Sequence, residues 1–122
     1  MLPIHYNNMA KLPPDRRGII WDFQQRLLDI VDEAKATELD LLERFGETEM
    51  TLGALEQLTE IAEQAKERFS QLSILQMRIA ESQPSATPDL LRLLDDRIVS
   101  ISSRIPALER STQEIKADWN LL

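Results

Sequence analysis

The sequence predicts an all-α protein, an up-down-up antiparallel three-helix bundle of long helices. Apolar residues recur at alternating spacings of three and four along three long stretches, which is the pattern of helices that each bury one face. Only 3 of the 122 residues are glycine, and β-branched residues do not alternate with polar ones over any long run. The three stretches are similar in length and are joined by short connections, so consecutive helices are expected to be antiparallel.

The first helix is expected over residues 15–45. Asp15 suits its first turn, and Gly46 follows its last residue, as glycine often does after a helix. A second apolar stripe beside the main one predicts that this helix packs on two neighbours. The main stripe is Ile20, Phe23, Leu27, Ile30, Ala34, Thr37 and Leu41, and the second is Trp21, Leu28, Val31 and Leu42.

The second helix is expected over residues 51–82, with Thr48 or Thr51 capping its start. Pro84 prevents it from continuing much further. Its apolar face is Leu55, Leu58, Ala62, Ala65, Phe69, Leu72, Gln76 and Ile79.

The third helix is expected over residues 88–122, capped by Thr87 and with Pro88 at its first position, where a missing N–H has no cost. Its apolar positions keep the same phase on both sides of Pro106, which predicts one continuous, kinked helix with this proline on its outer face. These positions are Leu91, Leu94, Ile98, Ile101, Ile105, Leu108, Thr112, Ile115, Trp119 and Leu122.

Two parts of this organisation have open alternatives. Because the apolar face of 88–122 needs neighbours but does not say which chain supplies them, a helical hairpin that dimerises into a four-helix bundle is the alternative fold. Residues 1–14 form an N-terminal tail with an unusual number of apolar side chains, which either dock on this chain or meet a partner. They include Leu2, Ile4, Tyr6, Met9 and Leu12.

Composition excludes several functional classes. The formal net charge is −7, whereas a protein that binds nucleic acid through the phosphate backbone needs a basic face. The chain has no cysteine, so disulfides, thiolate nucleophiles and zinc–sulfur sites are not expected. No apolar run reaches the ~20 residues that span a bilayer. A cytoplasmic protein is expected, or a nuclear one if the source is eukaryotic.

The sequence predicts no catalytic, cofactor-binding or metal-ligating residue. Its single histidine, His5, lies in the tail, and the Glu-x-x-His pairs of carboxylate-bridged metal sites are missing. No serine has a histidine near it in the sequence to act as a base. An alternative class is a small all-helical enzyme that works with Arg and Glu side chains alone.

The prediction for function is therefore a non-enzymatic interaction module, a scaffold, adaptor or small subunit that binds a protein partner or a second copy of itself, as in a homodimer. The expected interface gathers apolar residues that lie off the buried faces, at the end where the first and third helices begin. An acidic docking face for a basic partner is the alternative, because four glutamates of the second helix share one side. The expected interface is Trp21, Leu28, Ile74, Leu75, Met77, Leu93 and Val99; the acidic face is Glu56, Glu60, Glu63 and Glu67.

Overall fold

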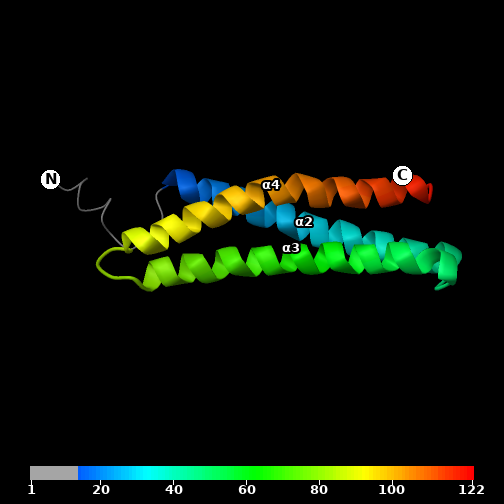
Figure 1. Ribbon diagram of the computed structural model, residues 1–122, viewed down its shortest axis with the longest axis horizontal. Helices are drawn as coiled ribbons and strands as arrows, with labels where there is room; N and C mark the ends of the chain where they lie inside the picture. The colour runs from blue at the N-terminus through cyan, green and yellow to red at the C-terminus, as the bar shows by residue number, and fades with distance from the viewer. Residues whose placement is uncertain (1–13) are drawn as a thin grey trace.

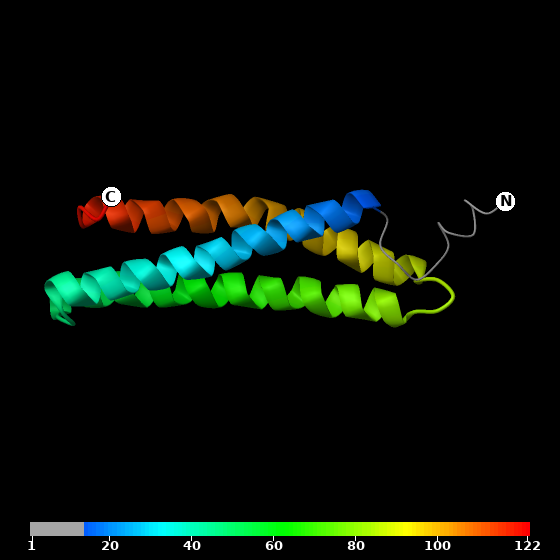
Figure 2. The same ribbon diagram turned by 180° about the vertical axis from the view of Figure 1, so that it is seen from behind.

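Three long helices make up residues 14–122, the part of the chain that the computed structural model describes. They are α2 (Pro14–Phe45), α3 (Glu49–Glu81) and α4 (Pro88–Asp118). Figures 1 and 2 show them side by side along one axis, with α2 and α4 beginning at the end where α3 finishes. The all-α, up-down-up three-helix bundle is confirmed. All three helices pack within one chain, so a two-helix hairpin that dimerises does not describe this fold. The tail lies outside the described residues except for Pro14, which begins α2.

Local hydrogen bonds determine where α3 begins. The hydroxyl oxygen of Thr48 accepts hydrogen bonds from the backbone N–H groups of Met50 and Thr51, each at 3.2 Å. In return, the N–H of Thr48 donates to the side-chain oxygen of Thr51 at 2.9 Å. This reciprocal capping box satisfies N–H groups that have no partner inside the helix. Thr48 is therefore the cap, and α3 starts at Glu49, two residues earlier than expected.

The other helix ends also follow from the local sequence. Gly46 has a φ of +74° and donates its N–H to the carbonyl of Leu42 at 3.0 Å, a left-handed turn that glycine adopts without steric cost. Thr87 caps α4 by accepting the N–H of Leu90 at 3.1 Å. At its other end α4 stops at Asp118, four residues earlier than expected, because Asn120 turns to a φ of 56°.

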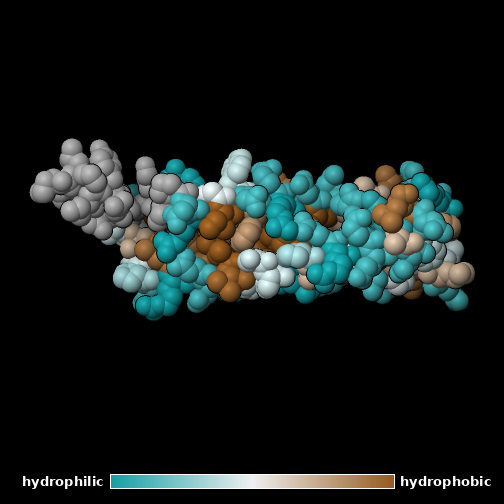
Figure 3. Space-filling view, turned by 90° about the horizontal axis from the view of Figure 1, so that it is seen from above, coloured by the Kyte–Doolittle hydropathy of each residue, from teal (hydrophilic) through white to brown (hydrophobic). Residues whose placement is uncertain are grey.

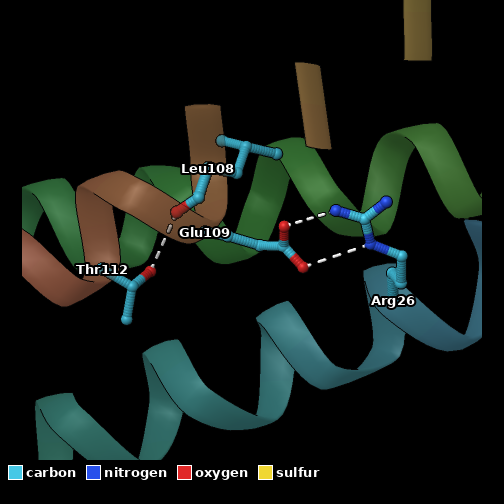
Figure 4. Close-up of polar contacts among 4 residues, drawn as sticks. All are labelled: Arg26, Leu108, Glu109 and Thr112. Carbon is cyan, nitrogen blue, oxygen red and sulfur yellow. Dashed lines mark hydrogen bonds and ion pairs between the residues drawn. The ribbon is translucent and has the colours of Figure 1, made fainter. Parts of the chain in front are cut away.

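The core is formed by the predicted apolar faces of all three helices. Thr112 takes a core position on α4 without an unpaired polar group, since its hydroxyl donates to the carbonyl of Leu108 at 3.2 Å (Figure 4). Gln24 is also buried, and its side-chain amide donates to the hydroxyl of Ser73 at 3.1 Å. The largest fully buried side chains are Ile20, Leu27, Leu41, Thr51, Leu58, Leu72, Ile79, Leu94, Ile101, Ile105 and Thr112.

Three parts of the predicted core are wrong. The second stripe of α2 does not pack on a further helix, because Trp21, Leu28 and Leu42 are exposed. Leu122, the last predicted apolar position of the third helix, is 80% exposed and lies beyond the end of α4. Conversely, Ile61 and Leu75 of α3 are 5% exposed although they lie off its predicted apolar face. The physical reason is that α3 contacts α2 and α4 on different sides, so its buried face is wider than one stripe.

Ion pairs fix the relative register of α2 and α4. Residue numbers rise together on the two helices, as they must when two neighbours run parallel. From the start of α2 onward the pairs are Arg16–Asp95 (2.8 Å), Arg26–Glu109 (2.6 Å) and Glu33–Lys116. At the far end, the rings of Phe45 and Trp119 lie 5.2 Å apart, so the end of α2 and the end of α4 also lie close together.

Pro106 lies inside α4, and the helix continues on both sides of it. Its side chain is exposed, whereas Ile105 and Leu108 beside it are buried. Figure 1 shows α4 changing direction near its middle. The prediction of a continuous, bent helix with the proline on its outer face is confirmed.

Candidate interaction surfaces

Four apolar side chains share the outward face of the α2–α3 pair. Met77, Trp21, Ile74 and Leu28 are 61%, 67%, 59% and 47% exposed. The Gln24–Ser73 hydrogen bond fixes the register of these antiparallel helices. Trp21 lies one turn before Gln24, and Met77 lies one turn after Ser73, so both steps lead toward the same end of the bundle. We call Trp21, Leu28, Ile74 and Met77 the α2–α3 patch.

The patch faces away from α4. On α2, Leu28 is two residues from Arg26, which binds Glu109 of α4, and two residues turn a helix by roughly 200°. Trp21 and Leu28 are seven residues apart and so lie on the same side of α2. With α4 on the opposite side, no helix in residues 14–122 covers these two side chains.

The structure divides the expected interface into three parts. The four residues of the patch are exposed, and each lies within about one helical turn of Gln24 or Ser73, which are hydrogen-bonded to each other. Leu75 is wrong as an interface residue, because it is buried in the core of its own chain. Leu93 and Val99 are 36% and 71% exposed, but they belong to α4 and lie away from the patch.

A further apolar area lies where α2 and α4 are close. Arg16 binds Asp95 at 2.8 Å, and Ile19 and Val99 each lie one turn beyond a member of this pair. Ile19 is 41% exposed and Val99 is 71% exposed. Figure 3 shows an apolar area on this side of the molecule, in the half where α2 and α4 begin. Ile19 is not among the interface residues expected from the sequence, because its exposure depends on how the helices cross.

The four glutamates of the predicted acidic face are all exposed on α3. Glu60 accepts a hydrogen bond from the side-chain amide of Gln64 at 3.1 Å. Glu56, Glu63 and Glu67 form no ion pair within residues 14–122. Their role as a docking face stays a prediction.

The interface between α2 and α4 carries a different chemistry, with paired charges around a cavity of about 290 Å³. Two nitrogens of Arg26 donate to the two carboxylate oxygens of Glu109, at 3.3 and 2.6 Å (Figure 4). This hydrogen bonding and the nearby negative charges of Glu109 and Asp22 raise the pKa of the Arg26 guanidinium above its usual value, while burial opposes the rise. Glu33, which also lines the cavity, binds Lys116. Two of the three carboxylates that line the cavity are thus paired with cations of this chain, whereas the third, that of Asp29, is exposed and forms no ion pair within residues 14–122.

No group of three or more histidine, cysteine, aspartate or glutamate side chains within residues 14–122 is arranged to hold a metal ion. None of the three helices combines the length and the apolar character that a membrane-crossing segment requires. His5 lies outside the described residues.

Comparison of the chain with protein-family models, with curated proteins and with solved structures finds no match.

Proposed function

We propose that this chain is a non-enzymatic interaction module, an adaptor or small subunit that binds a protein partner through the α2–α3 patch. The observation that carries the proposal is that four large apolar side chains are exposed within about one helical turn of the hydrogen bond that joins Gln24 of α2 to Ser73 of α3. Exposed apolar groups scattered singly need no explanation, whereas a contiguous group marks a binding surface.

The composition of the patch fits a protein interface. Tryptophan and methionine are enriched in interface cores, where an aromatic ring supplies a large apolar area and a thioether adapts to the partner's shape. Trp21 is the natural anchor, since it is the largest side chain in the patch and is 67% exposed. Rigid, paired helices present it at little cost in conformational entropy.

The proposal is tested by capture with immobilised protein and by sedimentation. Ile74→Glu combined with Met77→Glu places two charges in the patch, and Met50→Glu is the control, at an exposed residue in the first turn of α3 and outside the patch. We expect all variants to fold by circular dichroism. Proteins captured by the wild type, or self-association seen in sedimentation, should be lost with the double variant and kept with Met50→Glu.

Two results would contradict the proposal. If the folded double variant captures the same proteins and associates in the same way as the wild type, the patch is not the interface. If the double variant unfolds, the two side chains are part of the folding core, and Trp21→Ala then serves as the milder test of the same surface.

A further inference from the structure

A second exposed surface lies at the other end of the α2–α3 pair, where α2 ends and α3 begins. Here a groove of about 400 Å³ has an apolar floor made by Leu42, Leu52 and Leu55. Leu55 is 9% exposed, whereas Leu42 and Leu52 are 38% and 46% exposed and present apolar atoms to solvent. This groove therefore combines a packed base with two accessible anchoring points, and it does not include any residue of the α2–α3 patch.

The rim of the groove is acidic. Four of the eight lining residues are glutamates, Glu38, Glu47, Glu56 and Glu60, and no lysine or arginine of residues 14–122 lines the groove. Within the same range only Glu38 has a cation beside it, the ammonium group of Lys35 at 3.5 Å. Glu47 and Glu56 form no ion pair within residues 14–122.

The local charge remains negative after every nearby positive contribution is included. The N-terminus of α3 supplies an effective charge of about +0.5, and Lys35 supplies one more, against four carboxylates. A partner that covered the groove without cations would remove these carboxylates from water and leave them unpaired, which is costly. A partner that brings lysine or arginine replaces the lost hydration with charge-assisted hydrogen bonds.

We propose that this groove binds a basic, amphipathic segment of another protein. One or two large apolar side chains of that segment enter between Leu42 and Leu52, and lysine or arginine side chains beside them pair with Glu47 and Glu56. Charge complementarity selects this occupant over a second copy of the chain. Two copies of a chain with a net charge of −7 repel each other, so they associate only through a contact surface that is apolar and free of like charges. The carboxylates on the rim of this groove do not allow such a contact.

The groove includes only half of the acidic face expected from the sequence. Glu56 and Glu60 line the groove, whereas Glu63 and Glu67 do not. The two pairs have the same spacing of four residues, are on the same helix and are all exposed. Neutralising either pair changes the net charge equally, so the second pair is a matched control for long-range electrostatics.

The test uses a fluorescein-labelled synthetic helix of leucine and lysine with leucines at heptad spacing, and fluorescence anisotropy as the readout. We expect Glu56→Gln with Glu60→Gln to weaken binding tenfold or more, and Glu63→Gln with Glu67→Gln to change it less than about twofold. Leu52→Ser should also weaken binding, whereas Met50→Ser, at a residue 82% exposed and outside the groove, should not. A peptide with glutamate in place of lysine should not bind.

Three results would overturn the proposal. Equal losses in the two glutamine pairs would mean that only the overall charge attracts the peptide. Unchanged binding in the folded Leu52→Ser variant would mean that no side chain of the peptide enters the groove. If that variant fails to fold, NMR of the wild type replaces it, and amide signals of Leu42 and Thr59 that do not shift on adding peptide would overturn the proposal. Self-association of the wild type that Leu52→Ser abolishes would assign the groove to a second copy.

Binding at the groove and binding at the α2–α3 patch can be tested separately. Ile74→Glu with Met77→Glu leaves the groove intact, so it should leave the affinity for the leucine–lysine peptide unchanged. Loss of peptide binding in that variant would show that the peptide binds at the α2–α3 patch instead, and would refute the groove.

Discussion

Replacing Pro106 with alanine is expected to stabilise this protein, although the proline lies inside a helix of 31 residues. Proline has no N–H, so the carbonyl of Ser102, four residues earlier, cannot receive its usual helical hydrogen bond. The side chain of Pro106 is exposed, and alanine therefore removes no buried contact. The substitution changes the backbone and leaves the core residues Ile105 and Leu108 as they are.

The expected magnitude follows from three contributions. A restored backbone hydrogen bond adds about 0.5–1.5 kcal/mol to the free energy of unfolding, and relief of the clash between the proline ring and the preceding turn adds to this. Loss of proline's restriction on the unfolded chain subtracts about 0.4–1 kcal/mol. The full propensity difference of about 3 kcal/mol is an upper limit, because α4 already bends. We expect a net gain of about 1 kcal/mol, or about 4 °C in the thermal midpoint.

Urea denaturation followed by circular dichroism measures this change. Gln113→Ala, at an exposed position on the same helix, is the control and should change stability by less than about 0.5 kcal/mol. The midpoint should rise for Pro106→Ala at constant slope, since the surface exposed on unfolding is unchanged. A clear loss of stability would refute the reasoning, because it would show that the bend is needed to bury Leu94 and Leu108 on the two sides of it.

Three further substitutions test the core, a cap and an ion pair by the same denaturation assay. Leu58→Ala removes a side chain with 0% exposure and should cost about 2–5 kcal/mol; a cost below 1 kcal/mol would mean that this part of the core is loosely packed. Thr48→Ala removes the hydroxyl that accepts the N–H groups of Met50 and Thr51, keeps the backbone N–H that donates to Thr51, and should cost about 1 kcal/mol, whereas no change would show that water caps α3 equally well. A double-mutant cycle with Arg26→Gln and Glu109→Gln should give a coupling below about 1 kcal/mol that decreases with salt, because both side chains are more than a third exposed. The pKa of Arg26 is raised in the folded protein, so the stabilisation that its charge contributes is complete at every pH below the usual arginine pKa and is lost only as the pH rises through the raised pKa. A coupling energy that changed across the neutral pH range would contradict this.

The sequence by itself determined the local features of this protein. Each of them depends on residues close together in the chain: the cap of α4 at Thr87, a threonine cap for α3 at either Thr48 or Thr51, the turn at Gly46, and the phase of apolar residues across Pro106. Local hydrogen bonds and allowed backbone angles decide such features, so they could be predicted without knowing the neighbours. The order and direction of the helices followed in turn from the short connections between them.

Only the tertiary structure decided which of the remaining apolar residues are covered. Leu28 belongs to the predicted second stripe of α2 yet is 47% exposed, whereas Leu75 lies off the predicted face of α3 yet is 5% exposed. Periodicity shows which residues share a side of a helix, but it does not show how far each helix is rotated about its own axis or where the third helix crosses the other two. The same rotation leaves the α2–α3 patch uncovered and brings Leu42, Leu52 and Leu55 together beneath an acidic rim. These surfaces depend on contacts between residues far apart in the chain, and for that physical reason the sequence could supply their members but not their arrangement.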